Sequence, residues 1–263
     1  MKDLDIRKVN VVRYVTPLRE GGSLPALVEA DDEFLYVIKF RGAGQGPKAL
    51  IAELIGGELA RACGLLVPEL VFMTLDESFG RSEPDEEIQD LLRFSIGLNL
   101  GLHYLSGSIM YDPLASPVDV LTASKVVILD SLITNIDRTY KNPNLLSWNK
   151  ELWLIDHGAS LYFHYNMENW KSHAAKSFVQ VKDHVLLARA SELEAAANQV
   201  QTALTDDKIS GIIQAIPEVW LDDGSGGPSA DERRSIYTGY LSLRLSIIDS
   251  LLNEAQDARK GGL

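Results

Sequence analysis

The apolar positions in the first third of the chain predict short strands arranged around one helix. Between residues 47 and 63, apolar side chains recur every three or four positions, which is the spacing of a helix face. Pro47 suits the first position of that helix and Gly64 suits its end. The other apolar runs are short and several are rich in β-branched residues, and each predicts a strand: residues 9–15, 24–30, 33–40 and 67–75.

The second half of the chain has mainly helical patterns. Capping residues predict three helix starts: Ser116 with Pro117, Ser191 with Glu194, and Ser229 with Glu232. The first of these helices should run to about Thr134 and the last through Leu252. The acidic stretch at residues 76–90 predicts a solvated loop or linker. Strands followed by helices indicate an α+β fold rather than alternating βαβ units.

Composition narrows the classes of function. With 263 residues the chain makes one large domain or two lobes, and its net charge of −12 argues against nucleic-acid binding by phosphate neutralisation. No apolar stretch approaches the length of a membrane span, and residues 1–10 lack the apolar core of a signal peptide. Cys63 is the only cysteine, which excludes an intrachain disulfide. We therefore expect a cytoplasmic protein that does not bind membranes.

The candidate chemistry lies in the polar segment at residues 135–158. Apolar runs on both sides of a turn at residues 149–150 predict a hairpin. Such a hairpin brings the loop before it close to the residues just after it. Asp137, Asn142 and Asp156 should therefore converge, and three oxygen-bearing side chains in one place suit a hard cation such as Mg²⁺.

The spacing of these residues is typical of a phosphotransfer site. In kinases a catalytic-loop Asp is followed five positions later by a metal-binding Asn, and a strand pair then leads to a second metal-binding Asp near a Gly. Here Asn142 lies five positions after Asp137, and Asp156 with Gly158 follows the hairpin. The alternative is a pair of polar loops at the ends of a plain hairpin, because the Asp-to-Asn spacing alone is common.

A lysine in the third predicted strand adds a second part of such a site. Lys39 lies in an otherwise apolar run, where its charge must reach solvent or find an anionic partner. Glu53 on the following helix is the preferred partner, and Glu58, five positions later, faces another side. In kinases such a lysine holds nucleotide phosphates and the glutamate orients it. The alternative for Lys39 is a surface lysine on an edge strand.

Together these residues give the chain a resemblance to the HipA-like kinases, bacterial relatives of the protein kinases. The resemblance covers most of the chain and rests on these segments: residues 29–40, Glu53 with 64–68, 135–142 and 154–158. It implies a protein-kinase-like bilobal fold. Residues 1–105 would form an N-lobe with a small antiparallel β-sheet and one helix, and residues 106–263 a mainly helical C-lobe. It also implies ATP, Mg²⁺ and phosphoryl transfer to Ser or Thr.

The resemblance assigns expected roles to single residues. Asp137 would accept the proton of the acceptor hydroxyl, Asn142 and Asp156 would bind the metal, and Lys39 would bind phosphates. Apart from the resemblance, the position of Lys141 beside Asn142 suggests that it neutralises the transferred phosphoryl group. Three further residues lie where a phosphate-covering loop would be, although a plain hairpin turn fits them equally well: Gly21, Gly22 and Ser23. Ser23 is also a candidate autophosphorylation site by this likeness.

The acceptor and the activity remain open at the level of sequence. No Ala-Pro-Glu follows Asp156, so a peptide-docking platform is in doubt and a small-molecule or lipid kinase is one alternative. The acceptor is therefore a hydroxyl group on a protein or on a small molecule. A nucleotide-binding pseudokinase or scaffold is the other alternative, against which the presence of all five polar roles argues. Residues 101–111 should include the lobe connector, whose backbone would hold adenine.

Overall fold

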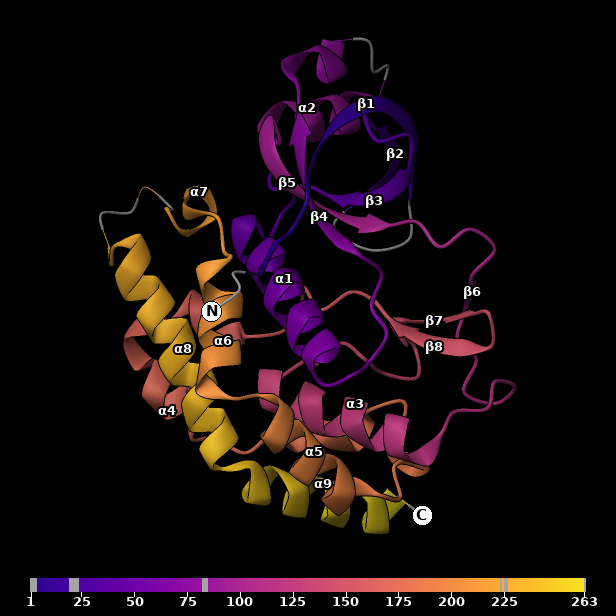
Figure 1. The fold of residues 1–263 in the computed structure, drawn as a ribbon, viewed down its shortest axis with the longest axis vertical. Helices are drawn as coiled ribbons and strands as arrows, with labels where there is room; N and C mark the ends of the chain where they lie inside the picture. The colour runs from indigo at the N-terminus through magenta and orange to yellow at the C-terminus, as the bar shows by residue number, and fades with distance from the viewer. Residues whose placement is uncertain (1–3, 19–23, 82–84, 223, 225–226, 263) are drawn as a thin grey trace.

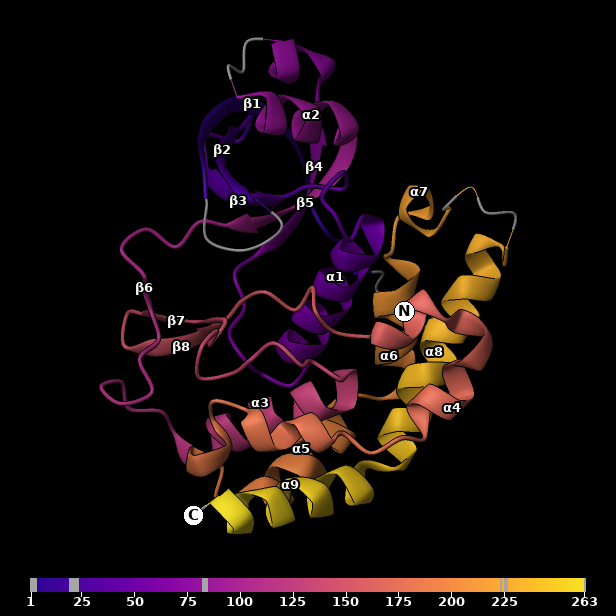
Figure 2. The same cartoon turned by 180° about the vertical axis from the view of Figure 1, so that it is seen from behind.

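The computed structural model describes residues 4–18, 24–81, 85–222, 224 and 227–262. A ring of strands lies above a long central helix, and most of the other helices gather below and beside that helix (Figure 1). The view from behind shows the same arrangement, with the small β6–β7–β8 sheet on one side of α1 and helices α6 and α8 on the other (Figure 2). No helix in the described part of the chain is long and apolar enough to cross a membrane.

The first strands form a closed barrel in the order β1-β2-β3-β5-β4. Its strands are β1 (Lys8–Pro17), β2 (Ala26–Ala30), β3 (Leu35–Lys39), β4 (Leu70–Leu75) and β5 (Gly97–His103). All pairings are antiparallel except that of β1 with β4, which is parallel and closes the ring. The expected small antiparallel sheet is thus wrong in two respects, closure and the parallel pair. Alternating apolar positions report which face of a strand is buried, but they do not report its partner.

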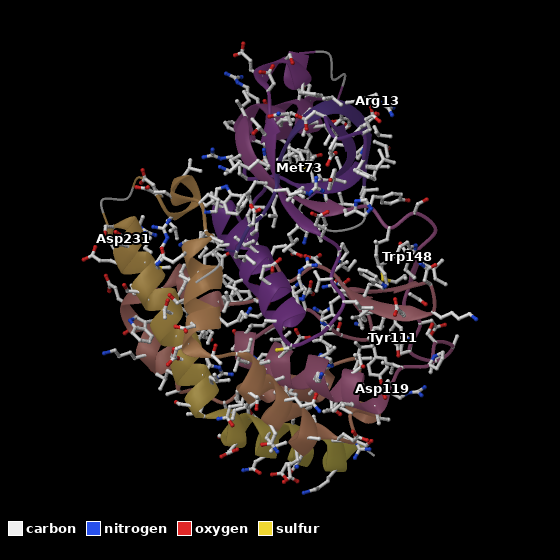
Figure 3. The ribbon with its side chains drawn as sticks, viewed as in Figure 1. Arg13, Met73, Tyr111, Asp119, Trp148 and Asp231 are labelled. Carbon is white, nitrogen blue, oxygen red and sulfur yellow. The ribbon has the colours of Figure 1, made fainter. Side chains whose placement is uncertain are left out.

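The acidic stretch after β4 is more ordered than its composition suggests. The structure has a 3₁₀ helix, η1 (Glu77–Arg81), and an α-helix, α2 (Glu86–Phe94), where a solvated loop was predicted. Asp85 caps α2 by accepting the Glu87 N–H at 3.1 Å. Negative charge is favourable at a helix N-terminus, so the acidic residues support this helix. Ile88 and Leu92 are buried in the core of the barrel, where Met73 also lies (Figure 3).

Helix α1 (Pro47–Ala62) is buried over most of its length. Its bounds match the prediction, with Pro47 at the first turn and Gly64 in the left-handed conformation after its end. The barrel has its own apolar core, but Leu50, Ile51 and Leu54 of α1 belong to the larger core that the C-terminal helices share. By packing, α1 is therefore part of the helical body, although it lies between two barrel strands in the sequence.

The helical body contains α3 (Val120–Ile133), α4 (Trp170–Ala174), α5 (Leu193–Ala203), α6 (Asp206–Gln214), α7 (Glu218–Leu221), α8 (Ala230–Ser246) and α9 (Ile248–Gly262). Short 3₁₀ helices join them: η2 (Tyr162–Tyr165), η3 (Met167–Asn169), η4 (Val179–Asp183) and η5 (Leu187–Arg189). The small sheet consists of β6 (Ile109–Met110), β7 (Leu145–Trp148) and β8 (Glu151–Leu154), so the predicted hairpin is confirmed.

The predicted helix starts have different outcomes. The capping box of Ser229 and Glu232 is present. The cap of α3 is Asp119, seen at the start of that helix in Figure 3, rather than Ser116. The capping box predicted at Ser191 is wrong, because α5 begins after Glu192 and no side-chain cap is found there among the described residues. The single long final helix is also wrong, because the chain breaks at Ile247 and continues as α9.

A buried histidine beside α8 should make the stability of the protein depend on pH. The ring of His164 lies 3.1 Å from the Tyr237 hydroxyl, and burial, with the Lys48 charge, lowers the pKa of His164 to about 3. The unfolded chain therefore binds a proton on His164 between about pH 6.5 and pH 3, whereas the folded chain does not. On this account the histidine reduces the free energy of unfolding by about 2 kcal/mol between pH 7 and pH 5. In His164→Asn, which keeps a polar partner for Tyr237, denaturant titrations should show a pH dependence weaker by that amount. An unchanged slope would contradict this assignment.

Candidate functional site

Three separate elements bring Lys39, Glu53 and Asp156 together. Lys39 ends β3, Glu53 lies in the middle of α1, and Asp156 follows β8. The Lys39 Nζ lies 2.5 Å from Glu53 Oε2 and 2.5 Å from Asp156 Oδ1. The lysine of the barrel is thus paired with one carboxylate from each of two other elements.

The choice between the two glutamates of α1 follows from where each side chain points. Glu58 pairs with Arg61, whose Nε lies 3.2 Å from its carboxylate. Glu53 is fully buried and accepts a second hydrogen bond, from the His157 N–H at 2.8 Å. Burial alone would raise the pKa of Glu53, but the charge of Lys39 and the contact with His157 outweigh it and bring that pKa well below its ordinary value. Glu53 is therefore a charged carboxylate in the protein interior.

The charge of Lys39 is held in the same way. Burial by itself would lower the pKa of Lys39, whereas the charges of Asp156 and Glu53 raise it above its ordinary value. The ammonium is therefore fixed between two anions. The Asp156 side chain is 46% exposed, so the Asp156 side of this three-residue cluster opens toward solvent.

The close approach of His157 to α1 depends on a glycine. His157 is fully buried, and a Cβ added at Gly56 would lie only 2.6 Å from the His157 Cβ. A side chain at position 56 would therefore push apart the helix that holds Glu53 and the segment that holds Asp156. Glycine at this point of the helix is required by packing rather than by backbone conformation.

Gly56→Ala should destabilise the protein and weaken the site. We expect a loss of about 1–3 kcal/mol in the free energy of unfolding, because the extra methyl group forces the backbone to shift. Gly211→Ala in α6 is the matched control, since a Cβ there meets nothing within 4 Å in the described structure. That change should stabilise the protein by about 0.5–1 kcal/mol. Equal effects of the two changes in urea unfolding would contradict the packing role of Gly56.

Asp137 lies in the loop between α3 and β7 with two amides on one of its oxygens. The Asn142 Nδ2 donates to Asp137 Oδ2 at 2.8 Å, and the Asn144 Nδ2 lies 3.3 Å from the same oxygen. Because Asn142 uses its amino group on Asp137, its amide oxygen is left to accept or to bind a cation. The spacing pattern indicated Asn142 but missed Asn144, which is buried and adopts a left-handed conformation.

The two halves of the candidate site meet at the open end of the hairpin. The Ile155 N–H donates to the Asn144 carbonyl at 3.1 Å, so the residues before Asp156 lie beside the loop of Asp137. The side-chain oxygens of Asn142 and Asp156 are hard donors of the kind that Mg²⁺ takes. Among the described residues, no group of three or more His, Cys, Asp or Glu side chains gathers to hold a metal by itself. The residues therefore fit a magnesium ion that takes some of its ligands from the protein and the others from bound phosphates. They do not fit a metal site made of protein side chains alone.

The remaining predicted site residues are less informative. Gly21, Gly22 and Ser23 lie outside the described residues. Lys141 is exposed in the loop between α3 and β7, next to Asn142. Within the expected connector, β5 continues to His103, and the Trp148 indole donates to the Ser106 carbonyl at 2.9 Å.

Sequence reasoning also missed a buried polar cluster beneath the loop, which we call the Asp130 cluster. It consists of Asp130, Asn135, Arg138 and His184. One signal could have revealed it. Asp130 interrupts an apolar stretch of α3, and a charge buried in such a stretch must have a partner. Its partner Arg138 is the residue directly after Asp137.

Comparisons with known proteins bear on the family and on the fold of the chain. The sequence model of a family described as HipA-like kinase matches residues 11–237. The fold is similar to that of the proinflammatory kinase CtkA of Helicobacter pylori, with a TM-score of 0.58 and 13% identity over 96% of this chain and 99% of that one. It is also similar to a Golgi casein kinase with Mn/ADP bound, with a TM-score of 0.53 and 10% identity over 98% of this chain and 74% of that one. No curated protein sequence matches the chain.

Proposed function

The chain belongs to the HipA-like kinases, and we propose that it transfers the γ-phosphoryl group of ATP to a hydroxyl group with the help of Mg²⁺. The observation that carries this proposal is the meeting of Lys39, Glu53 and Asp156 from three distant elements. A lysine that is only 14% exposed between two carboxylates costs desolvation energy, so a plain structural role explains it poorly. If Lys39 exchanges Asp156 for the phosphate oxygens of a nucleotide, the cluster has to be open to solvent on the side of Asp156, as it is.

In this proposal Lys39 and Glu53 bind the nucleotide. Lys39 contacts phosphate oxygens, and Glu53, fixed by the His157 N–H, holds the lysine in place. Lys141 and the amides of residues 21–23 add further contacts to the phosphates. Ser23 is also proposed as an autophosphorylation site. Lys39 and Lys141 place positive charge at the binding site itself, so a chain of net charge −12 can still bind a polyanionic nucleotide.

Asp137 is proposed to receive the acceptor. It orients the hydroxyl group and accepts its proton, while Asn142 and Asn144 hold the carboxylate in position. Asn142 and Asp156 hold the metal ion. When bound, Mg²⁺ neutralises charge on the phosphate oxygens and fixes their orientation. The contribution of the protein is therefore positioning and electrostatic stabilisation.

The proposed lobes follow the division seen in the sequence. Residues 1–105 would form the nucleotide-binding N-lobe and residues 106–263 the C-lobe with the catalytic loop and the metal ligands. The Lys39–Glu53 pair supports a coupling between the two bodies, because it joins strand β3 of the barrel to helix α1, which packs into the helical body. The acceptor is proposed to be a Ser or Thr hydroxyl of a protein.

Thermal unfolding combined with radiolabel transfer tests the proposed function. ATP with Mg²⁺ should raise the melting temperature of the wild type, by an amount equivalent to about 2.7 kcal/mol at a ligand concentration 100 times Kd. Incubation with γ-labelled ATP should move label onto Ser or Thr of a protein mixture. No thermal shift with any nucleotide would contradict the proposal. Label on lipid or sugar acceptors alone would move the protein to another class of kinase, and a shift without transfer would identify a pseudokinase.

A further inference from the structure

Arg138 contacts both halves of the candidate site with one side chain. Arg138 follows Asp137 directly in the sequence and is almost fully buried. Its Nη1 donates to the carbonyl oxygen of Asn144. The same nitrogen lies 3.3 Å from the carbonyl oxygen of Ile155. Asn144 hydrogen-bonds to Asp137, and Ile155 directly precedes Asp156. A single guanidinium therefore joins the backbone beside two of the three carboxylates of the site, Asp137 and Asp156.

The Asp130 cluster fixes the orientation of that guanidinium. The Arg138 Nε donates to Asp130 Oδ2 at 2.6 Å, and the Asn135 Nδ2 donates to Asp130 Oδ1 at 3.1 Å. The His184 Nδ1 accepts the Leu186 N–H at 3.0 Å, so its Nε2 carries the proton and donates to Asp130 Oδ2 at 2.9 Å. The aspartate of α3 thus has charged or polar donors on both oxygens.

The chain also holds the backbone of Arg138 from the other side. The Val185 N–H donates to the Arg138 carbonyl at 3.1 Å, and Thr139 pairs with His184 in an isolated bridge. The segment at residues 184–186 therefore binds both the side-chain partner of Arg138 and the main chain of the catalytic loop. Neither Asp130 nor His184 is within the Asp137–Asp156 motif itself, so the spacing pattern gave no role to either.

We propose that Arg138, held by Asp130 and His184, is the positioning residue that sets the separation between the loop of Asp137 and Asn142 and the segment of Asp156, and so forms the metal site before any ligand arrives. This inference rests on the proposed function, because it assigns to Arg138 the geometry of that same site. Charge alone does not suffice for this role. The guanidinium presents Nε to Asp130 and Nη1 to the two carbonyls in a rigid planar fork, whereas the single nitrogen of lysine cannot occupy both of these places at once.

Arg138→Lys should therefore weaken metal binding specifically. We expect the Kd for Mn²⁺, measured by electron paramagnetic resonance on protein loaded with a non-hydrolysable ATP analogue, to rise by about 10–100-fold. Affinity for the same analogue in EDTA depends on Lys39 and should change by less than about twofold. This readout separates positioning from general loss of structure, which would lower both affinities together.

Arg244 provides a matched control. It is as deeply buried as Arg138, and its guanidinium donates to the carbonyls of Leu132 and Ala174 at 3.1 and 3.2 Å, with no hydrogen bond to the loop of Asp137 among the described residues. Arg244→Lys should lower the melting temperature without changing the Kd for Mn²⁺. Equal weakening of Mn²⁺ binding in both variants would overturn the proposal, and so would wild-type Mn²⁺ affinity in Arg138→Lys.

Two further results complete the test. If Arg138→Lys does not fold, His184→Leu replaces it, with an expected loss of about 10-fold in Mn²⁺ affinity that His184→Gln restores by donating again to Asp130. Unchanged affinity in a folded His184→Leu protein overturns the proposal. Failure of the wild type itself to bind Mn²⁺ with the analogue overturns the proposed function and, with it, this positioning role.

Discussion

Asp137→Asn is expected to lower the rate of phosphoryl transfer by about 10³-fold while the affinity for nucleotide stays within about twofold of the wild type. Asparagine has nearly the same shape as aspartate and can still accept a hydrogen bond from the Asn142 amide. It is a far weaker base, however, and carries no charge to orient the acceptor hydroxyl. Single-turnover label transfer gives the rate, and titration with a fluorescent ATP analogue gives the affinity.

Two outcomes would contradict this role for Asp137. A rate within about tenfold of the wild type would show that another group accepts the proton. A large loss of nucleotide affinity would instead place Asp137 among the groups that hold the metal and phosphates. Asn144→Ala tests the support of the carboxylate separately, because its amide lies 3.3 Å from Asp137 Oδ2. It should reduce the rate less than Asp137→Asn does.

Of the single substitutions proposed, Lys39→Met should lower the free energy of unfolding the most. It leaves Glu53, which is fully buried, without the cation that keeps it charged, and loss of one partner of a buried pair costs about 3–5 kcal/mol. The thermal shift caused by ATP and Mg²⁺ should also disappear, since Lys39 is the proposed phosphate ligand. Urea unfolding at pH 7 measures the first effect and nucleotide-dependent melting the second.

A double variant separates the two effects of Lys39→Met. In Lys39→Met with Glu53→Gln the buried carboxylate is gone, so most of the lost stability should return, whereas the response to ATP should not. A double variant as unstable as Lys39→Met alone would show that the lysine stabilises the fold through contacts other than Glu53. Recovery of the ATP response would remove Lys39 from the nucleotide site.

The candidate site could be predicted as far as its residues are close in sequence or conspicuous in type. Asp137 and Asn142 share one loop, and a hairpin returns the chain to Asp156. Lys39 stood out as a charge in an apolar strand. A buried charge at Asp130 could have indicated that this residue needs a partner, but not that His184 is one, because the two are 54 residues apart and no spacing rule links them.

The fold was predictable in its local parts and not in its long-range pairing. The bounds of α1 follow from Pro47, Gly64 and the apolar spacing between them. The parallel pairing of β1 with β4, which closes the barrel, joins strands that no turn connects. Acidic residues before and within α2 made this helix hard to recognise, because its apolar face contributes few residues, of which Ile88 and Leu92 are buried. The composition of such a segment reports its average polarity and does not show that one face of it is apolar and buried.

A crystal structure of the protein with Mg²⁺ and a non-hydrolysable ATP analogue tests the central claim most directly. We expect the metal ion between Asn142, Asp156 and the phosphates, the Lys39 Nζ moved from Asp156 Oδ1 onto a phosphate oxygen, and Glu53 still paired with Lys39. The Asp137 carboxylate should face the γ-phosphate. A nucleotide bound elsewhere, or bound here with Lys39 still on Asp156 and no metal on Asn142, would contradict the account.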